Sequence, residues 1–131
     1  NGTIFMDYRN ETDFSDYNTM IYGHHMKTGA MFADLMKYKS QSFYEEHPYM
    51  YIYTPEKTYR LDLFAGAVVD CVAPIYSFDP SSSVINECIS NSTFDAVIDY
   101  PANHIVTLST YTYEYDDARY VILGDLVPIE Q

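Results

Sequence analysis

The chain has little of several features that mark common protein classes. It holds two cysteines, no tryptophan, and seven lysine and arginine residues against 19 aspartate and glutamate residues, so its formal net charge is −12 (7 minus 19). Two cysteines are too few for a disulfide framework, and they lack the number and spacing of a zinc site. The basic residues are scattered, which argues against a nucleic-acid partner because phosphate recognition needs gathered positive charge.

Long apolar runs are also missing from the sequence. No stretch approaches the roughly 18 apolar residues that cross a bilayer, and no signal segment opens the chain, so we expect the chain as given to be soluble. Its first six residues have the character of a buried strand, which predicts that the chain begins inside a domain. At 131 residues with 47% hydrophobic content, the chain is long enough for one domain with an ordinary core.

What the sequence does contain is tyrosine and recurrent strand patterns. Fifteen tyrosines suit half-buried sheet faces, where the ring packs and the hydroxyl stays wet. Helical spacing of apolar residues appears twice, at 31–36 and 84–89, and the second segment follows a proline and serines that can begin a helix. Strand signals occur at six places, namely 3–6, 19–22, 49–54, 59–69, 105–110 and 120–127.

The clearest alternation predicts a hairpin over 49–69, with its turn at residues 55–57. Tyr59, Leu61, Leu63 and Ala65 are expected on one face of its second strand. Mixed strands with short helices in the connections favour a mostly β fold, a closed or nearly closed barrel with helical decorations.

Two segments contain candidates for chemistry. His24 directly follows a predicted strand, where an imidazole can face a cleft and exchange protons near neutral pH; a packed polar residue is the plainer interpretation. The second segment, 107–119, reads Thr-Leu-Ser-Thr-Tyr and ends at Arg119. Ser109 and Thr110 either line a cleft with their hydroxyls or simply end a strand.

Together these segments resemble the class B sortases. That family has a strand ending in Thr-Leu-x-Thr-Cys, an arginine a short turn later, and an upstream Gly-His at another strand end. Residues 2–9, 21–27 and 52–55 are also similar to the family, so the likeness runs along essentially the whole chain. The resemblance implies a sortase-like β-barrel that lacks its first strands, with residues 1–131 as a single domain incomplete at its N-terminus.

The resemblance also implies roles for the site residues. His24 falls on the catalytic histidine, Arg119 on the arginine that stabilises substrate and oxyanion, and Tyr111 on the cysteine nucleophile, with Ser109 and Thr110 as substrate contacts. Members of the family are cysteine transpeptidases of Gram-positive bacteria, which cleave a sorting-signal peptide and pass the protein to a peptidoglycan amine. They need no cofactor, and the implied location is the extracellular face of the membrane or the cell wall.

Tyr111 departs from this pattern, because a phenol is a poor and bulky substitute for a thiolate. We therefore expect the chain to be inactive, whether the tyrosine is natural or engineered. Cys71 and Cys88 offer no evident replacement. Two other functions stay open: a non-catalytic module that binds sorting peptides or cell-wall fragments, and a degenerate fragment without function.

Two further expectations concern the barrel and a loop. A barrel without its first strands exposes edges, so the isolated chain is expected to be unstable, to self-associate, or to be completed by a separate segment. Asp7, Asn10, Asp13 and Asp16 form an acidic loop that could hold calcium weakly. The glycine and glutamate of an EF-hand are missing, which favours a solvated loop and no metal.

Overall fold

The computed structural model describes residues 3–7, 9–11, 14–24, 33–96, 104–111 and 117–129. At residues 3–5, 24, 33–34 and 111 it describes the backbone alone. Asp13, which the calcium hypothesis included, and residues 31–32 of the first predicted helix lie outside these ranges.

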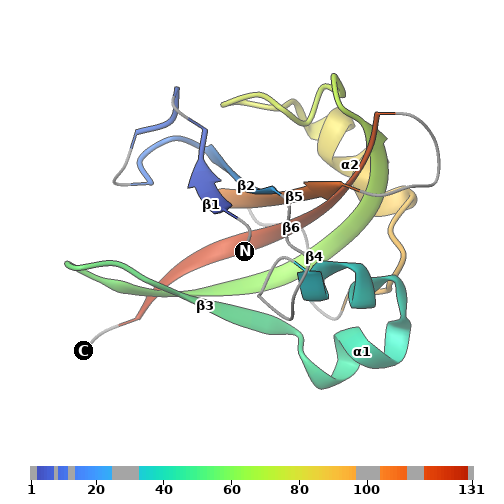
Figure 1. Ribbon diagram of the computed structural model, residues 1–131, viewed down its shortest axis with the longest axis horizontal. Coiled ribbons are helices and arrows are strands. Elements are labelled where there is room, and N and C mark those ends of the chain that lie inside the picture. The colour runs from blue at the N-terminus through green and yellow to red at the C-terminus, as the bar shows by residue number, and fades with distance from the viewer. Residues whose placement is uncertain are drawn as a thin grey trace.

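Six strands form one curled sheet with the order β1-β2-β5-β6-β4-β3 (Figure 1). β2 and β5 are parallel, and every other neighbouring pair is antiparallel. The mostly β prediction is confirmed, and the sheet is a half-barrel that leaves β1 and β3 as its edges. The strands are β1 (Thr3–Met6), β2 (Asn18–His24), β3 (Tyr49–Tyr53), β4 (Thr58–Asp70), β5 (Ile105–Tyr111) and β6 (Ala118–Ile129).

Helical segments cover both faces of the sheet. The 3-10 helix η1 (Ala33–Lys39) and the helix α1 (Gln41–Glu46) lie on one side, and the helix α2 (Ser82–Ser90) lies on the other (Figure 1). α2 begins as predicted, since the Ser81 side chain accepts a hydrogen bond from the Val84 amide at its first turn.

The two faces of the sheet carry separate hydrophobic cores. Under η1 and α1, Leu35 and Tyr44 pack with Leu61, Leu63 and other buried residues. Tyr44 stacks on Phe94 with ring centroids 4.2 Å apart. Under α2, the second core includes the buried side chains of Ile75, Ile85, Cys88, Val121 and Leu123.

A register shift in β4 changes which core its residues enter. The pairing with β6 slips between Leu63 and Ala65, which is the signature of a β-bulge. Leu61 and Leu63 pack in the first core as predicted, but Ala65 joins Phe64 in the second core. The prediction for Ala65 was wrong because strict alternation fails where one strand carries an extra residue.

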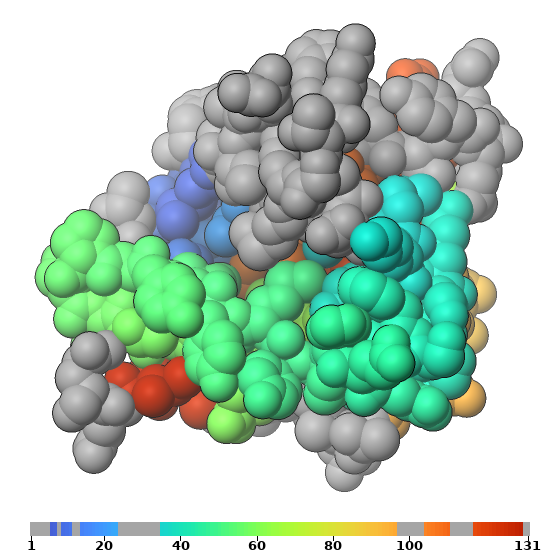
Figure 2. Space-filling view, turned by 60° about the horizontal axis from the view of Figure 1, so that its bottom comes forward, coloured from blue at the N-terminus to red at the C-terminus, as the bar shows by residue number. Residues whose placement is uncertain are grey.

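The two edges of the sheet border a hollow. A cavity of about 660 Å³ is lined by Met6 of β1, by Phe14, and by the β3–β4 hairpin over 52–57 and at Tyr59. Figure 2 shows the hairpin (green) next to the β1–β2 region (blue) on this face. The unpaired edges predicted from the sequence therefore lie across a shared hollow.

Candidate functional site

The strand register brings the three predicted catalytic positions into one row. Along the parallel pair, Tyr22 of β2 lies opposite Ser109 of β5. Continued by two residues to the ends of both strands, this register sets His24 level with Tyr111. Across the antiparallel pair, Tyr111 lies opposite Arg119 of β6. The backbone thus places His24, Tyr111 and Arg119 on three adjacent strands, and their chemical roles stay predictions.

Ser109 lies within an aromatic cluster just below this row. Its hydroxyl is 2.7 Å from the hydroxyl of Tyr76, and the Tyr76 ring stacks on that of Tyr22 with centroids 6.1 Å apart. Thr110 pairs with Tyr120, whose side chain packs in the first core. Because successive strand residues face opposite sides, Ser109 is the one of the two hydroxyl residues that shares a face with Tyr22 and Tyr76.

Both tyrosines of this cluster stay protonated at neutral pH. Burial raises the pKa of Tyr76 to about 12, although the Ser109 hydrogen bond and the nearby Arg119 charge act in the opposite direction. Burial, and next the hydrogen bond to Asp7, raise the pKa of Tyr22 well above its usual range. Neutral phenols with fixed rings can pack against a peptide.

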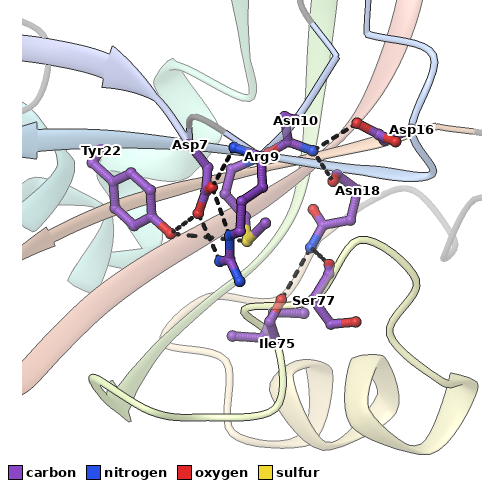
Figure 3. A network of polar contacts seen from close by, with 9 residues as sticks. Asp7, Arg9, Asn10, Asp16, Asn18, Tyr22, Ile75 and Ser77 are labelled. Carbon is purple, nitrogen blue, oxygen red and sulfur yellow. Dashed lines mark hydrogen bonds and ion pairs between the residues drawn. The ribbon is translucent and has the colours of Figure 1, made fainter.

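An ion pair fixes Tyr22 from the loop after β1 (Figure 3). The Asp7 carboxylate accepts hydrogen bonds from Arg9 Nε at 3.0 Å, from Arg9 Nη2 at 2.9 Å and from the Tyr22 hydroxyl at 2.9 Å. The hydrogen bonds from Arg9 lower the pKa of Asp7 to about 2. Arg9 also lies over the Phe78 ring, 5.4 Å from its centroid, so the same ion pair contacts the loop after β4.

Asn18 holds that loop against the sheet. Its buried side-chain amide donates to the carbonyl oxygens of Ile75 at 3.0 Å and Ser77 at 2.8 Å, and its oxygen accepts from the Thr107 hydroxyl at 2.8 Å. Ile75 and Ser77 flank Tyr76, so this clamp sets where Tyr76 meets Ser109. Figure 3 shows Asn18 reaching from β2 to the loop.

The acidic loop is a structural element in which the described carboxylates already have partners. Asp16 accepts from the Asn10 side chain at 2.9 Å and from the Glu11 amide at 2.8 Å, while Asp7 is held by Arg9. Among the described residues, no group of three or more histidine, cysteine, aspartate or glutamate side chains is arranged to hold a metal ion.

Arg119 contacts the backbone beside it, and of the two cysteines one is exposed and one is buried. The guanidinium of Arg119 donates to the Ala118 carbonyl oxygen at 3.0 Å. Cys71 is exposed just after β4, and Cys88 is buried on α2, where burial raises the pKa of its thiol to about 11. Such a thiol is a weak nucleophile, as expected from its place on the apolar stripe of the predicted helix.

The sequence did not single out Tyr22, Tyr76 and Asn18. The one available signal was the high tyrosine content, which does not identify individual positions. Asn18 contacts residues 57 and 59 positions away, and such a long-range pairing leaves no local pattern.

The Asp7 ion pair predicts a specific dependence of stability on acid. Because the folded pKa of Asp7 lies below the usual 3.8, its stabilisation is full above about pH 4 and is lost as pH falls through 2. The melting temperatures of the unmodified chain and of the Asp7→Asn variant should therefore differ most above pH 4 and become equal towards pH 2. Asp79→Asn, at an exposed carboxylate, serves as the control. A difference in melting temperature between the chain and Asp7→Asn that stays constant from pH 6 to pH 2 would contradict a stabilising role of the Asp7 ion pair.

Comparisons with known proteins agree on one relationship. No family model matches the chain. Sortase B from Listeria monocytogenes is 36% identical over 138 residues, covering 96% of this chain and 54% of the relative. A crystal structure of sortase B complexed with triglycine superposes with a TM-score of 0.85 at 27% identity, covering 98% of this chain and 64% of that one. A Staphylococcus aureus sortase B–substrate complex superposes with a TM-score of 0.81 at 27% identity, covering 98% of this chain and 63% of that one.

The half-barrel sheet has the fold of a sortase domain. Within that class the chain is a homologue of the class B sortases. It spans about half the length of the Listeria relative. None of its described helices is long and apolar enough to cross a membrane.

Proposed function

We propose that this chain is a class B sortase-like domain that keeps the positions of the catalytic site but does not carry out transpeptidation. The register supports this proposal, because it aligns His24, Tyr111 and Arg119 across three adjacent strands. In the family, the substrate is a sorting-signal peptide and the acceptor is a peptidoglycan amine, and we propose the same peptide and amine as the partners of this chain. By family likeness, the place of action is the extracellular face of a Gram-positive membrane or its cell wall.

The chemistry of residue 111 decides the activity. In a cysteine-bearing homologue, a thiolate attacks the peptide carbonyl, the histidine protonates the leaving amine, and an acyl-enzyme forms that the acceptor amine resolves. The arginine stabilises the developing oxyanion. A free thiol has a pKa of about 8.5 and a phenol about 10, and sulfur is the stronger nucleophile. Tyr111 therefore cannot replace the thiolate in the first step.

Incubation with fluorogenic sorting peptides tests this proposal directly. We expect no cleavage above the buffer rate by the chain. Listeria sortase B, assayed under the same conditions, is the positive control. Turnover by the chain at a rate comparable with that control would overturn the proposal.

A second candidate function is a module that binds peptides without reacting. The observation that favours it is the pair of partly exposed, stacked rings of Tyr22 and Tyr76 beside the row, held in place by the buried Ser109. Solved relatives bound to triglycine and to a substrate support peptides as ligands. A chain that neither binds nor cleaves sorting peptides would favour the third possibility, a degenerate fragment.

Tyr111→Ala separates two versions of the binding module. If the phenol ring fills the groove, its removal should create peptide affinity, measured by fluorescence polarisation with a labelled sorting peptide. If the ring is a platform for the peptide, the same change should weaken binding by roughly five- to 100-fold, the loss typical of one aromatic contact. We favour the filled groove, because a tyrosine ring is much larger than a thiol.

The unpaired edges also bear on assembly. Among the described strands, β1 and β3 each pair on one side only, and self-association through such edges would complete their hydrogen bonding. The net charge of −12 opposes contact between copies at low salt. We therefore expect the dimer fraction, measured by light scattering, to rise with ionic strength. A monomer that melts cooperatively at all salt concentrations would argue against both instability and self-association.

A further inference from the structure

A cavity of about 340 Å³ lies where β4 ends against α2, outside the row of site positions. Figure 1 shows α2 beside the curved end of β4. Within the cavity, Val69 is the backbone partner of Arg119, so the cavity lies one strand away from that row. Its apolar walls are made by Ala67, Val69, Ala73, Ile75, Val84 and Cys88.

The buried wall of the cavity is apolar and disfavours anions. Cys88 is only 6% exposed, and its thiol makes no hydrogen bond with the residues that the structure describes. Burial, together with the charge of Glu87, keeps its thiol protonated at neutral pH. A neutral thiol acts as a small apolar group, so this wall favours aliphatic atoms and disfavours a negative charge.

The rim of the cavity has the opposite character. Asp70 and Glu87 both line it and are exposed, and neither forms an ion pair with another described residue. Two carboxylates next to an apolar hollow are complementary to a cation on a hydrocarbon stem. A neutral apolar ligand would leave the two carboxylates without a cationic partner, and they would repel an anionic ligand.

We propose that this cavity is a binding site for a short aliphatic chain ending in a primary ammonium group. The hydrocarbon chain lies against Val69, Val84 and Cys88, and the ammonium lies between Asp70 and Glu87. The volume is at the small end of ligand pockets, which span about 300 to 1,000 Å³, so a chain of about five carbons is a suitable probe.

The site is independent of the proposed chemistry at residue 111. The loop after β4 forms a wall of the cavity through Ala73 and Ile75, and it also holds Tyr76 against Ser109. Ammonium binding is measured without any peptide, so its failure would leave the proposed function untouched. Equally, an active chain would not weaken the case for the cavity.

Titration of the chain with 1-aminopentane at neutral pH tests the proposal, with 1-pentanol as the matched neutral probe. Binding is followed through the NMR methyl signals of Ala67, Val69 and Val84. We expect saturable shifts of these signals with the amine and weaker binding of the alcohol. Each of Asp70→Asn and Glu87→Gln should weaken amine binding about two- to fivefold, since exposed ion pairs contribute modestly. Asp79→Asn, on the same loop but outside the cavity, should leave binding unchanged.

Ala73→Leu adds a steric test by placing extra methyl groups in the cavity, and it should remove the saturable shifts while the chain stays folded by circular dichroism. If that variant does not fold, the two charge variants still decide the matter. Equal affinity for amine and alcohol, amine binding unaffected by both charge variants, or no saturable shift at these methyl groups would each overturn the proposal.

Discussion

Replacing Tyr111 with cysteine is expected to give peptide cleavage at least about 100-fold above that of the unmodified chain, because acid–base and nucleophilic assistance each contribute on that scale. The expectation rests on the register, which places residue 111 opposite Arg119 and level with His24. Cleavage is measured with a fluorogenic sorting peptide. The variant is made in the chain and in a fusion to the part of Listeria sortase B that the chain does not match, since the chain spans 54% of that relative.

Two controls separate chemistry from access. Tyr111→Ala opens the same space without a nucleophile and should show no cleavage. Adding Arg119→Ala to the cysteine variant should reduce cleavage by about 100-fold or more, the loss typical of one oxyanion donor. Equal activity of the cysteine and alanine variants, in chain and fusion alike, would mean that residues 24, 111 and 119 do not form a working site.

Asn18→Ala should cause the largest loss of stability among single changes near the site, about 3 to 5 kcal/mol. The Asn18 side chain is fully buried and makes three hydrogen bonds, to Ile75, Ser77 and Thr107. Truncation leaves buried carbonyl oxygens without donors, and each such group costs roughly 1 to 3 kcal/mol. Urea unfolding followed by tyrosine fluorescence gives the free energy of unfolding.

Thr107→Val is the graded control for this clamp, because it removes only the hydrogen bond between Thr107 and Asn18. We expect it to cost about 1 kcal/mol. Asn18→Ala should also release the loop around Tyr76, which would appear as faster amide exchange at residues 75–78. A loss of stability no larger than that of Thr107→Val, with unchanged exchange, would show that the clamp does not hold the loop.

Much of the sheet could be predicted from the sequence because strand periodicity is local. All six predicted strands are present, with ends that agree to within two residues, and the helix after Ser81 begins at its capping signal. The bulge between Leu63 and Ala65 was missed, because it arises from pairing with β6. In the region of the first predicted helix, a 3-10 helix occupies 33–39. The helix α1 that follows is six residues long, too short for apolar spacing to reveal.

The candidate site was predictable only in part. Family likeness, rather than spacing, indicated that residues 24, 111 and 119 come together, and the strand register agrees with that arrangement. The parallel pairing of β2 with β5 joins segments more than 80 residues apart, which no local pattern encodes. For the same reason, the contacts of Tyr76 and Asn18 with distant residues became visible only in the fold.

From the family likeness and the strand register, we predict that the phenol of residue 111 lies between the imidazole of residue 24 and the guanidinium of residue 119. Nuclear Overhauser effects from the ring protons of Tyr111 in the folded chain test it most directly. We expect cross-peaks to both the His24 ring and the Arg119 side chain. Cross-peaks from Tyr111 to neither residue, in a spectrum where the β5–β6 backbone contacts are present, would contradict it.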